Sequence, residues 1–227
     1  MPRAMPPRQL ALALGHQASF AREDFLAGPC NAAALALIER WPDWPDRLLV
    51  LAGREGSGKS HLAAIWADAA GARFLAARSL GEANLRGALS TGALVIEDLA
   101  GGVLDERALF HLINLAREEG AFVLVTAQSA PSGWTLRLPD LASRLRALPV
   151  VELGAPDDAL LRAILVKLFA DRQITVEASL LVYLTARMER SFAAARALVE
   201  RLDREALRLH RPVTRALAAE VLGRDEP

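Results

Sequence analysis

A glycine-rich segment in the first quarter of the chain has residue types that can hold the phosphates of a nucleotide. It reads Gly53-Arg54-Glu55-Gly56-Ser57-Gly58-Lys59-Ser60 and meets the pattern Gly-x4-Gly-Lys-[Ser/Thr]. In such a segment the backbone N–H groups turn onto phosphate oxygens, Lys59 reaches the β- and γ-phosphates, and the Ser60 hydroxyl binds Mg²⁺. A glycine-rich turn before a helix is the alternative, but one of the chain's only two lysines stands where the pattern requires it. The segment predicts nucleotide binding.

Two adjacent carboxylates end a later apolar run, Ala93-Leu94-Val95-Ile96-Glu97-Asp98. Beside a phosphate-binding segment, such a pair holds Mg²⁺ and orients the water that attacks the γ-phosphate. A strand that ends in a polar turn would look the same in isolation. The presence of Gly53 to Ser60 in the same chain favours the metal interpretation. Glu97 is therefore a candidate metal ligand with Ser60, and both carboxylates are candidate catalytic groups.

Alternating strands and helices are needed to bring these residues together. Apolar runs that read as strands occur at 48–51, 72–76, 93–98, 122–126 and 150–153. Segments with helical spacing or composition lie between them, at 32–40, 61–67 and 105–119. This alternation predicts an α/β fold with a parallel sheet covered on both faces. Thr126 ends one of the strands, where a polar side chain faces the ligand crevice.

Beyond Pro156 the strand signals stop and helix caps take over. Asp157 and Ser191 are candidate N-caps of two helices, and Pro212 with Thr214 precedes a last short one. Residues 187–215 hold eight arginines against four acidic residues. Because aromatic residues are nearly absent there, a solvated helix surface is favoured over a nucleic-acid interface. The sequence predicts three parts: a flexible segment 1–19, a nucleotide-binding domain 20–154 and a helical domain 155–227.

The composition of the chain indicates in which cell compartment the protein functions and which kinds of partner it can attract. The chain has 227 residues, 52% of them hydrophobic, with 27 Lys+Arg against 27 Asp+Glu. Balanced charge creates no general attraction to nucleic acid or to anionic lipid. Cys30 is the only cysteine, which fits a reducing compartment. No run of about 18 apolar residues and no signal-peptide core occurs, so we expect a cytoplasmic protein without a membrane partner.

Near the N-terminus, leucines alternate with other residues in Gln9-Leu10-Ala11-Leu12-Ala13-Leu14. In an extended segment Leu10, Leu12 and Leu14 would face the same way. Periodicity alone favours an edge strand or a disordered end. The alternative is a short linear peptide that docks in the groove of another protein.

These motifs together resemble the AAA+ ATPases of the bacterial replication-initiator (DnaA) family. The resemblance covers almost the whole chain: the phosphate loop with Gly-Lys-Ser-His-Leu at 58–62, Ile96-Glu97-Asp98, Thr126, the run Leu138-Pro139-Asp140-Leu141-Ala142-Ser143-Arg144-Leu145, the spacing Phe20…Phe25…Gly28…Asn31 and the helical C-terminal part. It implies an AAA+ P-loop fold with a central parallel sheet flanked by helices, plus a C-terminal all-helical lid. The resemblance leads us to expect no counterpart of the initiator's DNA-binding helix-turn-helix domain, as in the family's regulatory members.

The resemblance also implies a nucleotide site that takes ADP or ATP with Mg²⁺. The residues it assigns to the nucleotide are Phe25, Leu26, Gly53, Glu55, Gly56, Ser57, Gly58, Lys59, Ser60 and His61. Two positions depart from the family pattern. Glu97 replaces the usual first aspartate, and Ala193 stands where the lid of the initiator carries a sensor arginine. Arg190 and Arg196 lie three residues to either side of Ala193.

Partners are implied in the same way. Gln9, Leu10, Leu12 and Leu14 are similar to the family's motif for the sliding clamp, the β subunit of DNA polymerase III. The Ser143-Arg144 pair matches the family's arginine finger, which implies that Arg144 acts in trans on ATP bound to the initiator DnaA. From the residues alone, Arg144 and Arg146 are ordinary solvated helix charges. If Arg144 is the finger, we expect its guanidinium to be exposed at the domain edge.

Three classes of function remain open at this point. The first is a regulator that bridges clamp and initiator, reaches DNA only through the clamp and can form a homodimer. The second is an autonomous ATPase, which would hydrolyse ATP without either partner. The third is a nucleotide-stabilised adaptor that binds DNA or a membrane, and its binding to DNA would be salt-sensitive and independent of the clamp.

Overall fold

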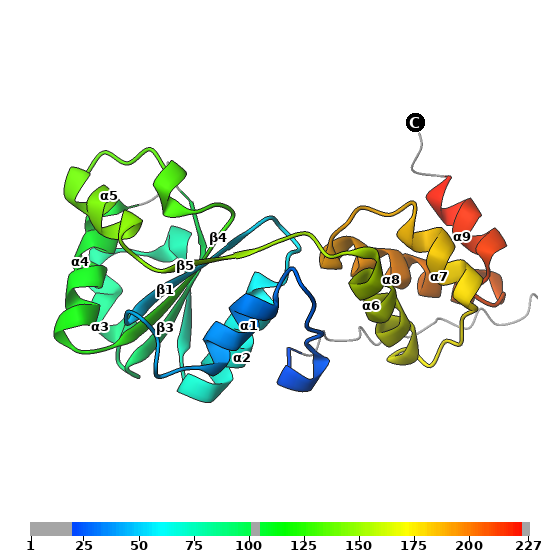
Figure 1. The fold of residues 1–227 in the computed structure, drawn as a ribbon, viewed down its shortest axis with the longest axis horizontal. Helices are drawn as coiled ribbons and strands as arrows, with labels where there is room; N and C mark the ends of the chain where they lie inside the picture. Colours follow the sequence, from blue (N-terminus) through cyan, green and yellow to red (C-terminus); the bar gives the residue numbers. More distant parts are fainter. Residues whose placement is uncertain (1–19, 101–104, 224–227) are drawn as a thin grey trace, which may run out of the picture.

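The structure, a computed structural model, describes residues 20–100 and 105–223. The Gln9 to Leu14 prediction lies outside the described residues. The centre of the fold is a parallel sheet in the order β2-β3-β4-β1-β5 (Figure 1). Its strands are β1 (Leu48–Gly53), β2 (Arg73–Ala76), β3 (Ala93–Leu99), β4 (Phe122–Ala127) and β5 (Val150–Leu153). The predicted α/β fold class is confirmed, and each predicted strand is present.

Helices cover both faces of the sheet (Figure 1). One face carries α1 (Ala32–Glu39) and α2 (Lys59–Ala70). The other carries α3 (Leu85–Ala88), α4 (Glu106–Glu118) and α5 (Pro139–Arg146). Short 3-10 turns lie at Arg22–Asp24, Ala77–Ser79, Glu82–Asn84 and Pro131–Gly133.

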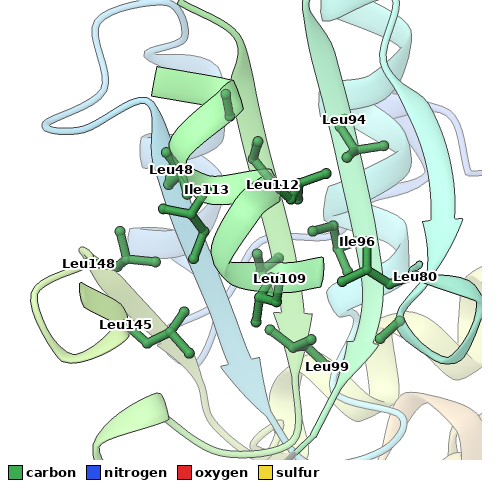
Figure 2. Packing of buried hydrophobic residues seen from close by; sticks show 14 of the residues in the cluster. Leu48, Leu80, Leu94, Ile96, Leu99, Leu109, Leu112, Ile113, Leu145 and Leu148 are labelled. Carbon is green, nitrogen blue, oxygen red and sulfur yellow. The ribbon is translucent and has the colours of Figure 1, made fainter. Parts of the chain in front are cut away.

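Strand β3 shows how the apolar runs produce two cores. Its buried residues alternate, with Leu94 and Ile96 in the core under α4 and Val95 in the core under α2. Figure 2 shows Leu109 and Leu112 of α4 lying over this first face. All of these side chains are at most 1% exposed, and burying one such side chain contributes about 1.5–3 kcal/mol. Because both faces of β3 are covered, its sequence reads as a continuous apolar run.

An aromatic cluster lies in the core of the α1–α2 face. The Trp44 and Trp66 rings stack with centroids 5.0 Å apart, and Phe122 meets Trp44 edge-on at 5.9 Å. Trp41 packs against the same Phe122 ring. Trp66 belongs to α2, so this cluster anchors the helix that follows the phosphate loop.

The C-terminal part is helical, as predicted, and forms a separate core of its own. It contains α6 (Asp158–Ala170), α7 (Ala178–Thr185), α8 (Phe192–Leu209) and α9 (Arg215–Leu222). Asp157, Ser191 and Thr214 each accept a hydrogen bond from a first-turn backbone N–H, so the three predicted caps are present. Tyr183 of α7 lies under the guanidinium groups of Arg187 and Arg215. In the described part of the chain, no helix is long and apolar enough to cross a membrane.

Candidate nucleotide-binding site

The phosphate loop connects β1 to α2 and depends on glycine at three positions. Gly56 and Gly58 have φ of 70° and 96°, a backbone region that L side chains rarely adopt. A Cβ added to Gly53 would lie 2.7 Å from the Ser57 Oγ and 2.9 Å from the Leu153 carbonyl oxygen. Gly58 is the N-cap of α2, so the helix begins at Lys59 with its free N–H groups at the loop. This arrangement forms a concave, backbone-lined anion site.

Lys59 is the cation of this loop and is only 7% exposed. Its ammonium donates hydrogen bonds to the carbonyl oxygens of Gly53 (2.7 Å) and Arg54 (2.9 Å). Burial lowers the pKa of Lys59, and the nearby carboxylates of Asp98 and Glu55 oppose that effect. A phosphate group in the loop would supply the negative charge that compensates for this burial.

Ser57 provides a test of whether a nucleotide fits. Its hydroxyl is buried and has no hydrogen-bond partner among the residues that the structure describes. Leaving a buried hydroxyl unpaired costs about 1–3 kcal/mol. A ligand or water oxygen in the loop can satisfy it. The unpaired hydroxyl, the buried ammonium and the start of α2 together fit the phosphates of a nucleotide.

The two predicted carboxylates lie at the end of β3, where the register with β4 shifts between Ile96 and Leu99. Alternation from Val95 places Glu97 on the α2 face of the sheet. Asp98 adopts a positive φ of 57°, and its backbone N–H donates to the Thr126 hydroxyl at 3.0 Å. Thr126 is fully buried, and this hydrogen bond to its hydroxyl fixes the backbone of Asp98.

Protein side chains would supply only a few of the ligands of a metal ion bound beside the phosphate loop. No group of three or more His, Cys, Asp or Glu residues suited to a metal occurs within residues 20–100 and 105–223. Mg²⁺ typically takes only one or two carboxylates and completes its shell with water and phosphate oxygens. Glu97 and the exposed Ser60 are the residues that would hold it, together with the nucleotide itself.

Comparison with known proteins decides the fold. No protein-family model matches the chain. The chromosomal replication initiator DnaA of Thermomicrobium roseum is 26% identical over 234 residues, which cover 88% of this chain and 48% of that protein. The chain thus spans about half the length of this curated relative. Domain III of DnaA from Thermotoga maritima superposes with a TM-score of 0.74 at 20% identity, covering 92% of this chain and 98% of that one. The chain has the AAA+ fold.

Two further solved structures share it. AMPPCP-bound DnaA from Aquifex aeolicus gives a TM-score of 0.68 at 15% identity over 83% of this chain and 66% of that one. The Thermotoga maritima RuvB R170A variant gives 0.72 at 16% identity over 90% and 72%. At these identities the likeness shows the fold alone, and the sequence of this chain is in addition similar to that of DnaA at 26% identity.

Residues 20–31 form a segment that packs beside the phosphate loop, where the sequence predicts the adenine of the nucleotide, and we call it the adenine-side segment. The Phe25 ring meets His61 of α2 edge-on at 5.1 Å. The His61 Nε2–H donates to the Ala21 carbonyl oxygen at 2.9 Å, and burial is the main cause that lowers the pKa of this imidazole. Asn31, 1% exposed, donates to the Leu26 carbonyl oxygen and accepts from the Gly28 N–H. This fixes the turn at Leu26, one of the predicted nucleotide contacts.

The lid touches the phosphate loop directly, a contact that sequence reasoning missed. The Phe192 backbone N–H, at the start of α8, donates to the Gly56 carbonyl oxygen at 2.9 Å. A Cβ on Gly56 would come within 2.7 Å of the Ala193 Cβ. The Phe192 ring lies 3.4 Å from where a Gly58 Cβ would be. Ala193, for which the family resemblance predicts the position of the sensor arginine, thus lies with its methyl group against the phosphate loop.

Charged residues also connect the lid to the adenine-side segment. Lys167 of α6 pairs with Asp24 at 2.7 Å and with Asp171 at 2.8 Å. The Arg196 guanidinium lies 5.8 Å from the centre of the Phe20 ring. Arg190 instead pairs with Asp158 on α6. Of the two arginines that flank Ala193, Arg196 is therefore the one directed toward the adenine-side segment.

Arg144 belongs to α5, a helix on the other face of the sheet from α2 (Figure 1). Its guanidinium donates to the Asn114 side-chain oxygen and lies 4.7 Å from the centre of the Phe110 ring, both on α4. We expected an exposed guanidinium, but Arg144 is half-buried because α4 supplies these two partners. A cavity of about 410 Å³ opens on the same face, lined by Phe110, His111 and Leu138 among others.

Proposed function

We propose that this protein is an Hda-type (HdaA) regulator that stimulates hydrolysis of the ATP bound to DnaA. The observation that carries the proposal is the position of Arg144. Its guanidinium is fixed to α4, on the sheet face opposite the helix that follows its own phosphate loop. An arginine in that place is directed away from the nucleotide of its own chain. It is suited to a nucleotide held by a neighbouring subunit.

The chemistry proposed for Arg144 is electrostatic. As the γ-phosphate leaves, negative charge spreads over its oxygens, and a guanidinium inserted from the neighbouring molecule stabilises that charge. Such a residue contributes about 10³ to 10⁵ in rate. The planar group can meet two phosphate oxygens at once, which a lysine ammonium cannot do.

The protein's own nucleotide has a structural role in this proposal. Gly53, Glu55, Gly56, Ser57, Gly58, Lys59, Ser60 and His61 would hold ADP or ATP with Mg²⁺, and Phe25 with Leu26 would contact the base. The lid contacts both the loop, through Phe192, and the adenine-side segment, through Lys167. A nucleotide between them would therefore keep the two parts of the AAA+ domain in one arrangement.

The clamp is the second proposed partner, and it would bind Gln9 to Leu14. A clamp-binding peptide is short and extended, which fits alternating leucines in a terminal segment. We expect deletion of residues 1–14 to abolish clamp binding and to leave the melting temperature unchanged, because the core that the structure describes begins only at Phe25. Retained affinity for immobilised clamp in the truncated protein would argue decisively against the docking peptide.

An autonomous ATPase is the second candidate function. It is favoured by Glu97, on the α2 face, and by Asp98, whose charge acts on Lys59. In DnaA-family terms Glu97 is one methylene longer than the usual aspartate, so we expect slow intrinsic hydrolysis. ATP turnover by the purified protein at a rate that neither clamp nor DnaA changes would favour this candidate.

One assay separates the candidates. DnaA loaded with radiolabelled ATP is mixed with clamp-loaded DNA, with or without this protein, and single-turnover hydrolysis is followed. The proposal expects faster conversion to ADP only when clamp, DNA and this protein are all present. Conversion at the rate of DnaA alone under every condition would refute it.

A further inference from the structure

Two residues of α4 hold the guanidinium of Arg144 from two sides. The Asn114 side-chain oxygen accepts one of its N–H groups, and the Phe110 ring lies against it with 4.7 Å from the Arg144 Cζ to the ring centroid. Asn114 and Phe110 are four residues apart on α4, so both project toward α5. A long side chain that usually samples many rotamers is thereby restricted to one place.

We infer that Asn114 and Phe110 are positioning residues that pre-organise Arg144 for the ATP of a partner subunit, an inference that rests on the proposed function. Arginine offers five N–H donors, and Asn114 engages one guanidinium nitrogen. The remaining donors stay available to phosphate oxygens. Because the guanidinium is already in place, less conformational entropy is lost when it meets the transition state.

Arg146 shows what the same helix does without such partners. It lies two residues further along α5, faces solvent, and has no hydrogen bond or ion pair to any residue that the structure describes. Positions two apart on a helix face in different directions, so Arg146 cannot share the contacts with α4. Of these two arginines, only Arg144 is therefore held by α4. Arg146 can serve as the matched control.

The test measures single-turnover hydrolysis of DnaA-bound ATP, with clamp-loaded DNA, over a range of concentrations of this protein. We expect Asn114→Ala and Phe110→Leu each to lower the maximal rate about three- to tenfold, with little change in the concentration that gives half of it. Phe110→Tyr keeps an aromatic face and should retain the wild-type rate. Arg146→Ala should behave like wild type.

A second readout follows the guanidinium itself. In ¹H–¹⁵N correlation spectra, the proton of the Arg144 Nε–H should carry a ring-current shift from Phe110 that Phe110→Leu removes and Phe110→Tyr keeps. Asn114→Ala should move the same signal toward the value of a solvent-exposed arginine. A role of Asn114 and Phe110 in stability alone would lower the melting temperature and leave the maximal rate of hydrolysis of DnaA-bound ATP unchanged.

The outcomes distinguish the inference from the proposed function. If the wild type does not stimulate DnaA, the proposed function is wrong, and so is the positioning of a finger. If the wild type stimulates but Asn114→Ala and Phe110→Leu retain its maximal rate, only the inference about α4 is wrong. A raised half-saturating concentration at an unchanged maximal rate would likewise overturn it, because Asn114 and Phe110 would then serve docking.

Discussion

The two faces of the sheet hold two sites that differ in how many of their parts the chain itself provides. On the α2 face, the phosphate loop is supported by the adenine-side segment and by the start of α8. On the α4 face, Arg144 is held by Asn114 and Phe110, whereas the phosphate loop leads into α2 on the opposite face. Under the proposed function, the first site needs only a small molecule, whereas the second needs another protein. The following predictions test this division, beginning with the largest effect.

Arg144→Ala should affect only the partner. We expect the stimulated rate of DnaA-bound ATP hydrolysis to fall about 10³-fold, or to the full extent of the stimulation. Because the lost interaction is made in the transition state, nucleotide and clamp binding by this protein should stay unchanged. Arg144→Lys should rescue poorly, since an ammonium lacks the planar fork. Single-turnover kinetics check this, and a variant as active as wild type would exclude Arg144 as the finger.

Lys59→Ala should affect only the protein's own nucleotide. A ligand present at 100 times its Kd stabilises the folded state by about 2.7 kcal/mol, and we expect the variant to lose that gain. Lys167→Ala is the matched control, because it removes the other lysine and its pairing with Asp24 but leaves the loop intact. Melting temperatures with and without excess ADP measure the effect. An equal ADP shift in Lys59→Ala and wild type would contradict the assignment of the loop.

Gly56→Ala should show that the lid is part of the first site. Alanine at a positive φ costs about 1–2 kcal/mol, and at Gly56 the new methyl group would also meet Ala193. Gly71→Ala supplies the control, since Gly71 has a similar φ of 63° and nothing within 4 Å of an added Cβ. We expect denaturation without nucleotide to show a larger loss for Gly56→Ala. Equal losses would mean that the lid does not press on the loop.

His61→Gln should reveal a small dependence on pH. The pKa of His61 is lowered in the folded state, so the unfolded state binds more protons as the pH falls. Its contribution to stability is present above about pH 6.5 and is lost as the pH falls through that value toward the folded-state pKa. Asp24 opposes this, while Arg196 and Lys167 add to it. We expect wild type to lose more stability than His61→Gln between pH 7.5 and 5.5, measured by urea unfolding.

Local sequence signals were sufficient for the strands, the caps and the phosphate loop. Asp157, Ser191 and Thr214 cap helices through a backbone N–H three residues away, so a short window of sequence contains the whole interaction. The phosphate loop is similarly contiguous. Helix α2 begins two residues before the predicted His61, because Gly58 in a left-handed conformation lets the helix start at Lys59.

Contacts between distant parts of the chain could not be predicted in this way. Phe192 meets Gly56 across 136 positions, and Asn114 meets Arg144 across 30. No spacing of residues in the sequence predicts either contact, because each contact depends on how whole helices and strands pack against one another. The positive φ of Asp98 likewise lies where the register between β3 and β4 shifts, which depends on the pairing of two distant strands. The expectation of an exposed Arg144 differed from the structure for this reason.

The aromatic residues are distributed so that each part of the molecule has its own optical signal. All four tryptophans precede residue 155, and three of them, Trp41, Trp44 and Trp66, pack in the α1–α2 core, while the single tyrosine, Tyr183, belongs to the helical lid. Light at 295 nm therefore excites only the nucleotide-binding part of the chain. A lid that unfolded first would leave tryptophan emission unchanged while helical circular dichroism fell. Tryptophan emission and circular dichroism together can thus show, without an added label, whether the two parts of the protein unfold together.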